Sequence, residues 1–139
     1  MKKLQSEVLL EGNAHGRVLR LTTDISFWGG VDPESGTIID RRNPAFGESV
    51  AGRVLAMQRS IGSSSGSSVL LELFRRNRAP SAIILVEADM VVVLGAVVAR
   101  EMGFDPIPVI RVSGPEFHAL PAAVNINLSG EIETCKEME

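Results

Sequence analysis

The chain has 139 residues, enough for one domain with its own core, and 45% of them are hydrophobic against 22% charged, as in soluble globular proteins. Its formal net charge of -3 argues against nucleic acid or an anionic membrane as the main partner. The longest apolar run, Met90 to Ala99, is shorter than the roughly 20 residues that span a bilayer, and no secretory signal is visible, so we expect a cytoplasmic protein.

The first half of the chain is predicted to hold two short strands and a long irregular segment. Residues 7–12 are apolar in the middle, and residues 17–21 alternate between polar and apolar, as a half-buried strand does. Residues 23–50 show little periodicity and are rich in glycine and proline, with a brief strand candidate at residues 37–40. A long irregular segment in a compact domain is usually functional or disordered, and the aromatic residues of this one favour function.

The second half alternates strands and helices. Strands are predicted at residues 53–57, 81–86 and 107–112, with a helix from Val69 to the arginines before Pro80 and a second at 90–102 that Asp89 caps. This order favours a parallel β/α unit with right-handed crossovers. A strand at 124–128 closes the domain, and a charged tail is expected from about residue 131. The sequence therefore predicts a single α/β domain over residues 1–139.

The strongest candidate site is a serine-rich loop, Gly62-Ser-Ser-Ser-Gly-Ser-Ser68, between a predicted strand and a predicted helix. Ligands of open α/β sheets tend to bind at this place, and the free N–H groups of a helix N-terminus attract carboxylate or phosphate. The alternative is a flexible loop that ends in a serine helix cap. The loop lacks the lysine and the spacing of a nucleotide-binding P-loop.

The segment Trp28-Gly-Gly-Val-Asp-Pro33 is the second candidate. It places a turn beside a large aromatic ring, with carboxylates nearby at Asp24, Asp32 and Asp40. The simpler interpretation is a turn in which Trp28 is buried as a core anchor, and on the residues alone we favour it. The pair Arg41-Arg42, which follows, either meets an anionic substrate or a partner or has a plain surface role.

Metal-binding signals are weak in this chain. Its one cysteine, Cys135, is interpreted as a free thiol on the tail, since one thiol cannot form an internal disulfide or hold a metal cluster alone. The histidines, His15 and His118, stand far apart in sequence, so we expect no metal site.

Two motifs give the chain a family resemblance. The string Ser26-Phe-Trp-Gly-Gly-Val-Asp-Pro33, followed by Gly36, Ile39-Asp40 and Pro44, resembles the small subunit, or swivelling domain, of the aconitase X family, as does the serine loop that opens a Val-Leu-Leu-Glu helix. The resemblance covers roughly residues 7–130. The family often has histidine before the proline of the second motif, where this chain has Asn43, which puts in doubt any role for an imidazole there.

The resemblance implies a swivelling β/β/α three-layer domain that docks on a large subunit, with an iron–sulfur cluster on that subunit's own cysteines and none bound by this chain alone. By similarity to the wider superfamily, Ser63 is the expected catalytic base, and Gly62, Ser64 and Ser65 are expected to bind a small anionic hydroxy acid. A helix N-terminus offers some of the donors and positive charge that a serine alkoxide needs.

The implied reaction is the elimination of water from a hydroxy acid, by a subunit that is inactive alone. The resemblance leans to cis-3-hydroxy-L-proline, giving Δ1-pyrroline-2-carboxylate, and phosphomevalonate is the alternative substrate. A non-catalytic anion-binding module is the alternative to an enzyme subunit.

Overall fold

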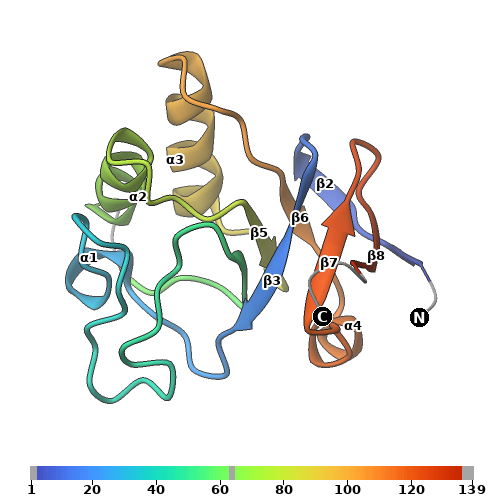
Figure 1. Cartoon of the computed structure of the whole chain (residues 1–139), viewed down its shortest axis with the longest axis horizontal. Coiled ribbons are helices and arrows are strands. Elements are labelled where there is room, and N and C mark those ends of the chain that lie inside the picture. Colours follow the sequence, from blue (N-terminus) through green and yellow to red (C-terminus); the bar gives the residue numbers. More distant parts are fainter. Residues whose placement is uncertain (1–2, 63–64, 136–139) are drawn as a thin grey trace.

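The computed structural model describes residues 3–62 and 65–135 and arranges their strands in one mixed sheet with the order β1-β8-β7-β3-β4-β5-β6-β2 (Figure 1). The strands are β1 Leu4–Gln5, β2 Glu7–Leu10, β3 Ala14–Arg20, β4 Val54–Met57, β5 Ala82–Leu85, β6 Val109–Arg111, β7 Ala123–Ile126 and β8 Glu131–Thr134. The helices are α1 Phe27–Gly30, α2 Ser65–Arg75, α3 Met90–Glu101 and α4 Gly114–His118. Within the described ranges, no helix is long and apolar enough to cross a membrane.

Strand β3 joins two parts of the sheet. Its first residues, 14–17, pair antiparallel with β7, while residues 18–20 pair parallel with β4. Strands β4, β5 and β6 are parallel neighbours, as the alternation of strands and helices predicts, and β2 adds an antiparallel edge beyond β6. The sheet therefore has a parallel part, which carries the α2 and α3 crossovers, and an antiparallel part built from β7, β8 and β1.

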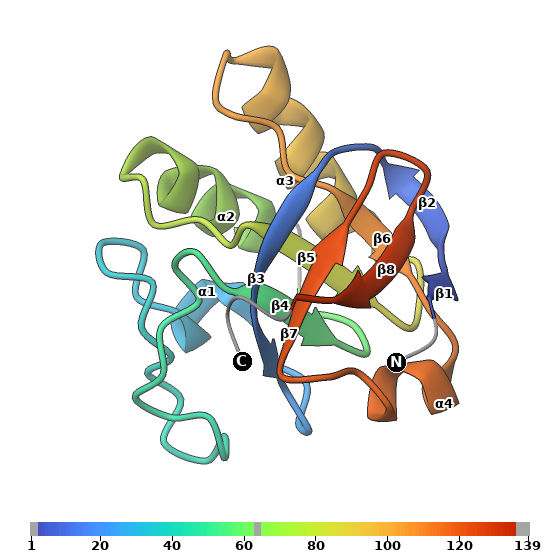
Figure 2. The same ribbon diagram turned by 45° about the vertical axis from the view of Figure 1, so that its right-hand side comes forward.

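The parallel strands are buried on both faces. Along β4, Leu55 and Met57 join the core cluster beneath α2 and α3, whereas Val54 and Ala56 join a cluster with β7, β8 and α4. This split follows from the two-residue period of a strand. Figure 2 shows β7 and β8 passing in front of β4 and β5, on the side away from α2 and α3. The layers are helices, parallel strands and antiparallel strands, which is the β/β/α arrangement that the resemblance implies.

The two long helices lie very close together where they meet. A Cβ atom built on Gly95 of α3 would lie 3.1 Å from Leu70 Cδ2 and 3.4 Å from Ser67 Cα, both on α2. A larger side chain at this position would push the helices apart, so Gly95 permits the close packing. Asp89 caps α3 as predicted, since its Oδ1 accepts hydrogen bonds from the backbone N–H groups of Val91 and Val92 at 3.0 and 3.3 Å.

Several predicted boundaries are wrong. The charged tail expected from about residue 131 is instead strand β8, which pairs with β7 and β1 because Ile132 alternates with polar neighbours and is fully buried. Cys135 follows β8 and is a buried free thiol rather than part of a tail. Helix α2 begins at Ser65, four residues before the predicted Val69, and residues 37–40 form only isolated bridges.

Candidate functional site

The structure brings the serine loop and the tryptophan segment together. Ile25 forms a parallel bridge with Ser60, and the Ile61 N–H donates to the Ile25 carbonyl at 2.9 Å. One residue further along each segment, a Cβ atom built on Gly62 would lie 3.1 Å from Ser26 Oγ. Two motifs that are about 30 residues apart in the chain thus lie side by side beyond the C-terminal end of β4.

Of the predicted site residues, the described structure places Gly62 and Ser65. Gly62 has a φ of +105°, a conformation that glycine adopts readily and other residues rarely do. Ser65 is the first residue of α2 and is exposed. Ser63 and Ser64 lie outside the described residues, so the assignment of Ser63 as the base stays a prediction. The predicted position of the loop, between a strand and a helix N-terminus, is confirmed.

Asp89 ties the approach to the loop to helix α3. While its Oδ1 caps the helix, its Oδ2 accepts a hydrogen bond from the Ser60 N–H at 2.6 Å and a short one from Ser60 Oγ. The carboxylate therefore links the residue two before Gly62 to a helix that begins 30 residues later. Sequence reasoning found the capping role but not this link, because no local pattern signals a contact across that separation.

Two open depressions lie on either side of Gly62. One, of about 380 Å³, is lined by Arg59, Ser60, Gly62 and the start of α3. Arg59 Nε lies 3.3 Å from Glu87 Oε2 and 3.7 Å from Asp24 Oδ2. The other, of about 400 Å³, is lined by Ser26, Trp28, Gly29, Gly30, Ile39, Asp40, Arg41 and Arg42. Gly62, where the loop begins, thus lines one depression and lies against a residue of the other, and arginine side chains line both.

The tryptophan segment is not a core anchor, so the favoured interpretation of Trp28 is wrong. Trp28 is 67% exposed, and its neighbour Phe27 enters the core with 1% exposure. Residues 28 and 29 leave the helical conformation within α1, Gly29 with a φ of +84°, and this break turns the indole outward.

The three nearby aspartates have different roles. Asp32 closes its own turn, where hydrogen bonds from the Glu34 N–H and the Ser35 hydroxyl lower the pKa of its carboxyl. Asp24 pairs with Arg59 beside one depression, and Asp40 pairs with Arg42 at 3.6 Å in the other. Asp32 is therefore structural, while Asp24 and Asp40 lie at the site.

Arg41 and Arg42 differ in their surroundings: Arg41 contacts an aromatic ring, and Arg42 lies on the surface. Arg41 stacks its guanidinium 5.9 Å from the centre of the Phe46 ring, within the range of a cation–π contact. Arg42 is almost fully exposed apart from its pairing with Asp40. Both side chains line the depression beside Trp28, so both stay candidates for meeting an anion or a partner.

Asn43, the departure from the family pattern, is a structural residue. It is buried, its Nδ2 donates to the Thr23 carbonyl at 3.2 Å, and its Oδ1 accepts from the Ala45 N–H at 2.9 Å. These bonds fasten the irregular segment to the chain just before Asp24. The amide at this position holds a loop, and nothing in its contacts points to proton transfer.

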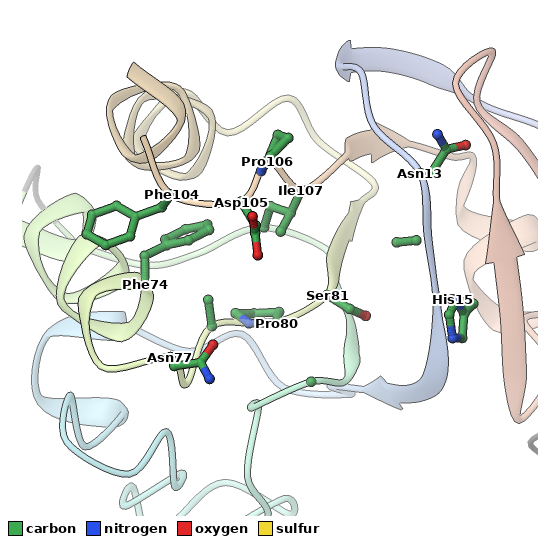
Figure 3. A pocket seen from close by; sticks show the side chains of 13 residues that line it. Asn13, His15, Phe74, Asn77, Pro80, Ser81, Phe104, Asp105, Pro106 and Ile107 are labelled. Atoms are coloured by element: carbon green, nitrogen blue, oxygen red, sulfur yellow. The ribbon is translucent and has the colours of Figure 1, made fainter. Parts of the chain in front are cut away.

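A further pocket, of about 410 Å³, lies at the N-terminal ends of the parallel strands, opposite the serine site (Figure 3). It is lined by residues that precede β4, β5 and β6, among them Gly52, Ser81 and Ile107, and by Phe74 and Phe104, whose ring centres are 6.4 Å apart. Because the serine loop follows β4 rather than preceding it, this pocket is no part of the serine site.

The described residues form no group of three metal-binding side chains that could hold a metal ion. The one cysteine is buried beyond β8, away from the loop that follows β4. The side chains described in this chain therefore do not fit the ligand set of an iron–sulfur cluster, which needs thiolates gathered in one place.

With this geometry in place, comparison with known proteins decides the family. The family model of the aconitase X swivel domain matches residues 3–136.

The chain belongs to the aconitase X swivel domain family.

Relatives of this swivel domain occur both inside long chains and as separate small ones. It is 47% identical over 114 residues to the cis-3-hydroxy-L-proline dehydratase of Pseudomonas aeruginosa, covering 82% of this chain but 20% of that protein. The share is also 20% for the enzyme of the same name from Hypocrea jecorina, so the chain spans a fifth of either relative. It is 35% identical to the phosphomevalonate dehydratase small subunit of Thermococcus kodakarensis, covering 99% of each chain.

The fold of this swivel domain is confirmed by a solved structure. The crystal structure of Thermococcus kodakaraensis aconitase X in its holo-form matches with a TM-score of 0.85 and 34% sequence identity, over 97% of this chain and 99% of that one. The α/β architecture and the family resemblance that the sequence predicts are both confirmed.

Proposed function

We propose that this swivel domain is the small subunit of an aconitase-like hydro-lyase that dehydrates cis-3-hydroxy-L-proline to Δ1-pyrroline-2-carboxylate. The observation that carries the proposal is the meeting of the serine loop and the tryptophan segment at the N-terminus of α2, with Gly62 against Ser26. The 47% identity to a dehydratase that carries this substrate in its name supports the choice of substrate.

In the proposed reaction Ser63 is the base. Its alkoxide takes the proton from C2 of the substrate, the electron pair forms the C2–C3 double bond, and the C3 hydroxyl departs, so that one water leaves in all. The resulting enamine, Δ2-pyrroline-2-carboxylate, becomes Δ1-pyrroline-2-carboxylate when the ring N–H proton moves to C3. Gly62, Ser64 and Ser65 hold the substrate carboxylate at the start of α2, where the helix dipole favours negative charge. The N-terminal end of α2 would therefore stabilise both the substrate carboxylate and the serine alkoxide.

The large subunit would hold the iron–sulfur cluster and complete the site, which makes the small chain inactive alone. This assignment rests on the family and on the lack of fit between the described side chains of this chain and a cluster. What this chain contributes is a hydroxyl base and an anion-binding helix end.

Phosphomevalonate dehydratase is the second candidate, and one observation favours it. The match to the Thermococcus kodakarensis small subunit runs from end to end of both chains, whereas the hydroxyproline dehydratases are about five times longer than the matched region. The same helix end would then face a substrate with both a carboxylate and a phosphate.

The test is reconstitution. The chain is co-expressed with its large subunit, the complex is purified anaerobically, and turnover of cis-3-hydroxy-L-proline and of 5-phosphomevalonate is measured. We expect turnover of the first. Turnover of the second alone would replace the substrate, and a stable, cluster-loaded complex that turns over neither would favour a non-catalytic anion-binding module.

Ser63→Ala is the first variant to compare in this complex. It should lower kcat by about 10²–10⁴-fold, the usual contribution of a general base. Ser68→Ala, at an exposed position on α2, is the matched control and should leave kcat unchanged. Full activity of Ser63→Ala would remove Ser63 from the mechanism without affecting the assignment of the reaction.

A further inference from the structure

Exposed apolar side chains gather around the serine loop. Among the described residues, nine large apolar side chains are exposed: Val8, Trp28, Ile39, Phe46, Ile61, Met90, Leu94, Met102 and Leu128. Single exposed apolar residues are normal on a protein surface, but a contiguous group marks an interaction site. What matters is therefore whether these residues adjoin one another.

Six of the nine form a connected band. Phe46 lies under Arg41, which shares a depression with Ile39 and Trp28. That depression is also lined by Ser26, which touches Gly62, the residue after Ile61. Gly62 lines the other depression together with Met90, and Leu94 follows Met90 by one helical turn on α3. The docking band is defined as Phe46, Ile39, Trp28, Ile61, Met90 and Leu94.

The other three exposed apolar residues lie elsewhere. Val8 is on the edge strand β2, Met102 is at the C-terminal end of α3, and Leu128 is in the turn after β7. Residue 126 of β7 pairs with residue 14 at the start of β3, whereas the band lies beyond the end of β4. Leu128 therefore lies near the start of β3, at the opposite end of the parallel strands from Gly62.

The Trp28 side chain does not contribute to the core of this domain. Phe27 already fills the core position, and Gly29 beside the indole has nothing within 4 Å of where a Cβ would be. An exposed tryptophan within an apolar band is the residue type that most often anchors a protein–protein interface.

We propose that this band is the face on which the large subunit docks, with Trp28 as its anchor. The inference rests on the proposed function. The band runs past Gly62, where the loop that the proposed reaction uses begins, so a partner that covers the band also closes two open depressions and excludes water from the site. In the two hydroxyproline dehydratases, the matched region is a fifth of one polypeptide, so related domains occur joined to a much longer stretch of chain.

The test measures the dissociation constant between this chain and the separately purified large subunit. Trp28→Ala should raise Kd by about 30-fold, the effect of losing an interface anchor. Leu94→Asp places a charge in the band outside both depressions and should raise Kd by at least tenfold, with kcat regained when the large subunit is saturating. Leu128→Asp is the matched control, a leucine of nearly equal exposure (55% against 53%), and should bind as the unchanged chain does.

Three outcomes would overturn the proposal. The first is an unchanged Kd for both band variants, and the second is an equal loss of binding for Leu128→Asp. The third is a dimer of this chain in sedimentation that Leu94→Asp dissociates, because the band would then join two copies. An inactive wild-type complex that still loses affinity through the band variants would overturn the proposed function and leave the docking face standing.

Discussion

At the scale of single residues, Gly62 sets the position of the serine loop. Its φ of +105° is costly for any residue with a side chain, and an added Cβ would press on Ser26 Oγ at 3.1 Å. That hydroxyl donates to the Trp28 carbonyl at 2.9 Å, so a push at Gly62 reaches the tryptophan turn as well. One glycine therefore joins the geometry of the proposed base to that of the proposed anchor.

Gly62→Ala should lower both stability and activity. Backbone strain alone costs about 1–3 kcal/mol. The displaced loop should lower kcat of the complex by about 10² or less, since a shift near 1 Å can cost that much. Gly103→Ala is the control, because Gly103 has a similar φ of +91° but open space at its Cβ, at the far end of α3. It should lose stability, measured by denaturant unfolding, and keep kcat; equal kcat for both variants would contradict the role of Gly62.

At the scale of elements, the C-terminal end of α2 carries an ion-pair cluster that makes stability depend on pH. Glu72 accepts hydrogen bonds from Arg75 and Arg76, three and four residues on, and these guanidinium groups lower the pKa of Glu72 to about 2. A carboxyl whose pKa is lowered by folding stabilises the protein fully above its unfolded pKa near 4.5. That contribution is lost as the pH falls towards 2.

Glu72→Gln should therefore lower Tm at pH 6–7, and the difference from the wild type should shrink between pH 4.5 and 2. The cluster is solvent-exposed, so the effect at neutral pH is expected to be small and to weaken in high salt. The same substitution in an Arg75→Gln, Arg76→Gln background is the control and should leave Tm almost unchanged. A difference in Tm that stays constant down to pH 2 would contradict the ion-pair explanation.

The elements that the sequence predicts well are those with strong local signals. Strands β4 and β5 are continuous apolar runs bounded by polar turns, and Asp89 stands just before an apolar helical run. Strand β8 was missed because its charged residues hide the alternation around Ile132, and because its partners β1 and β7 come from both ends of the chain. The charged residues of this segment favour a tail when the sequence is taken alone, and the two-residue alternation becomes clear only from the pairing of β8 with its neighbours.

The candidate site shows a similar limit. The serine loop and the tryptophan segment are each visible as motifs, but their contact depends on the Ile25–Ser60 bridge, which no periodicity predicts. Which of two adjacent aromatic residues enters the core was also beyond the pattern, since Phe27 and Trp28 are both suited to burial and a backbone break at Gly29 decides between them.

At the scale of the whole molecule, the packed core of the described residues and the proposed site lie in different places. Two core clusters cover both faces of the parallel strands, so these strands are buried within the described part of the chain. Gly62, at the start of the serine loop, by contrast lines one open depression and lies against Ser26, which lines the other, and residues of the docking band line both. Stability and proposed activity are thus separated in space, and variants of the band should affect assembly without affecting folding.

This separation predicts that a covalent tether rescues an assembly defect and cannot rescue a chemical one. Joining the chain to its large subunit through a flexible linker that spans the two raises the effective concentration to about the millimolar range. Leu94→Asp should then recover the kcat of the tethered wild type even in dilute solution, whereas tethered Ser63→Ala should stay inactive. In two relatives the matched region is a fifth of a longer chain, so a domain of this kind can be part of one polypeptide. If tethered Leu94→Asp stays as impaired as Ser63→Ala, Leu94 acts on the chemistry rather than on docking. Recovery of both would instead remove Ser63 from the reaction.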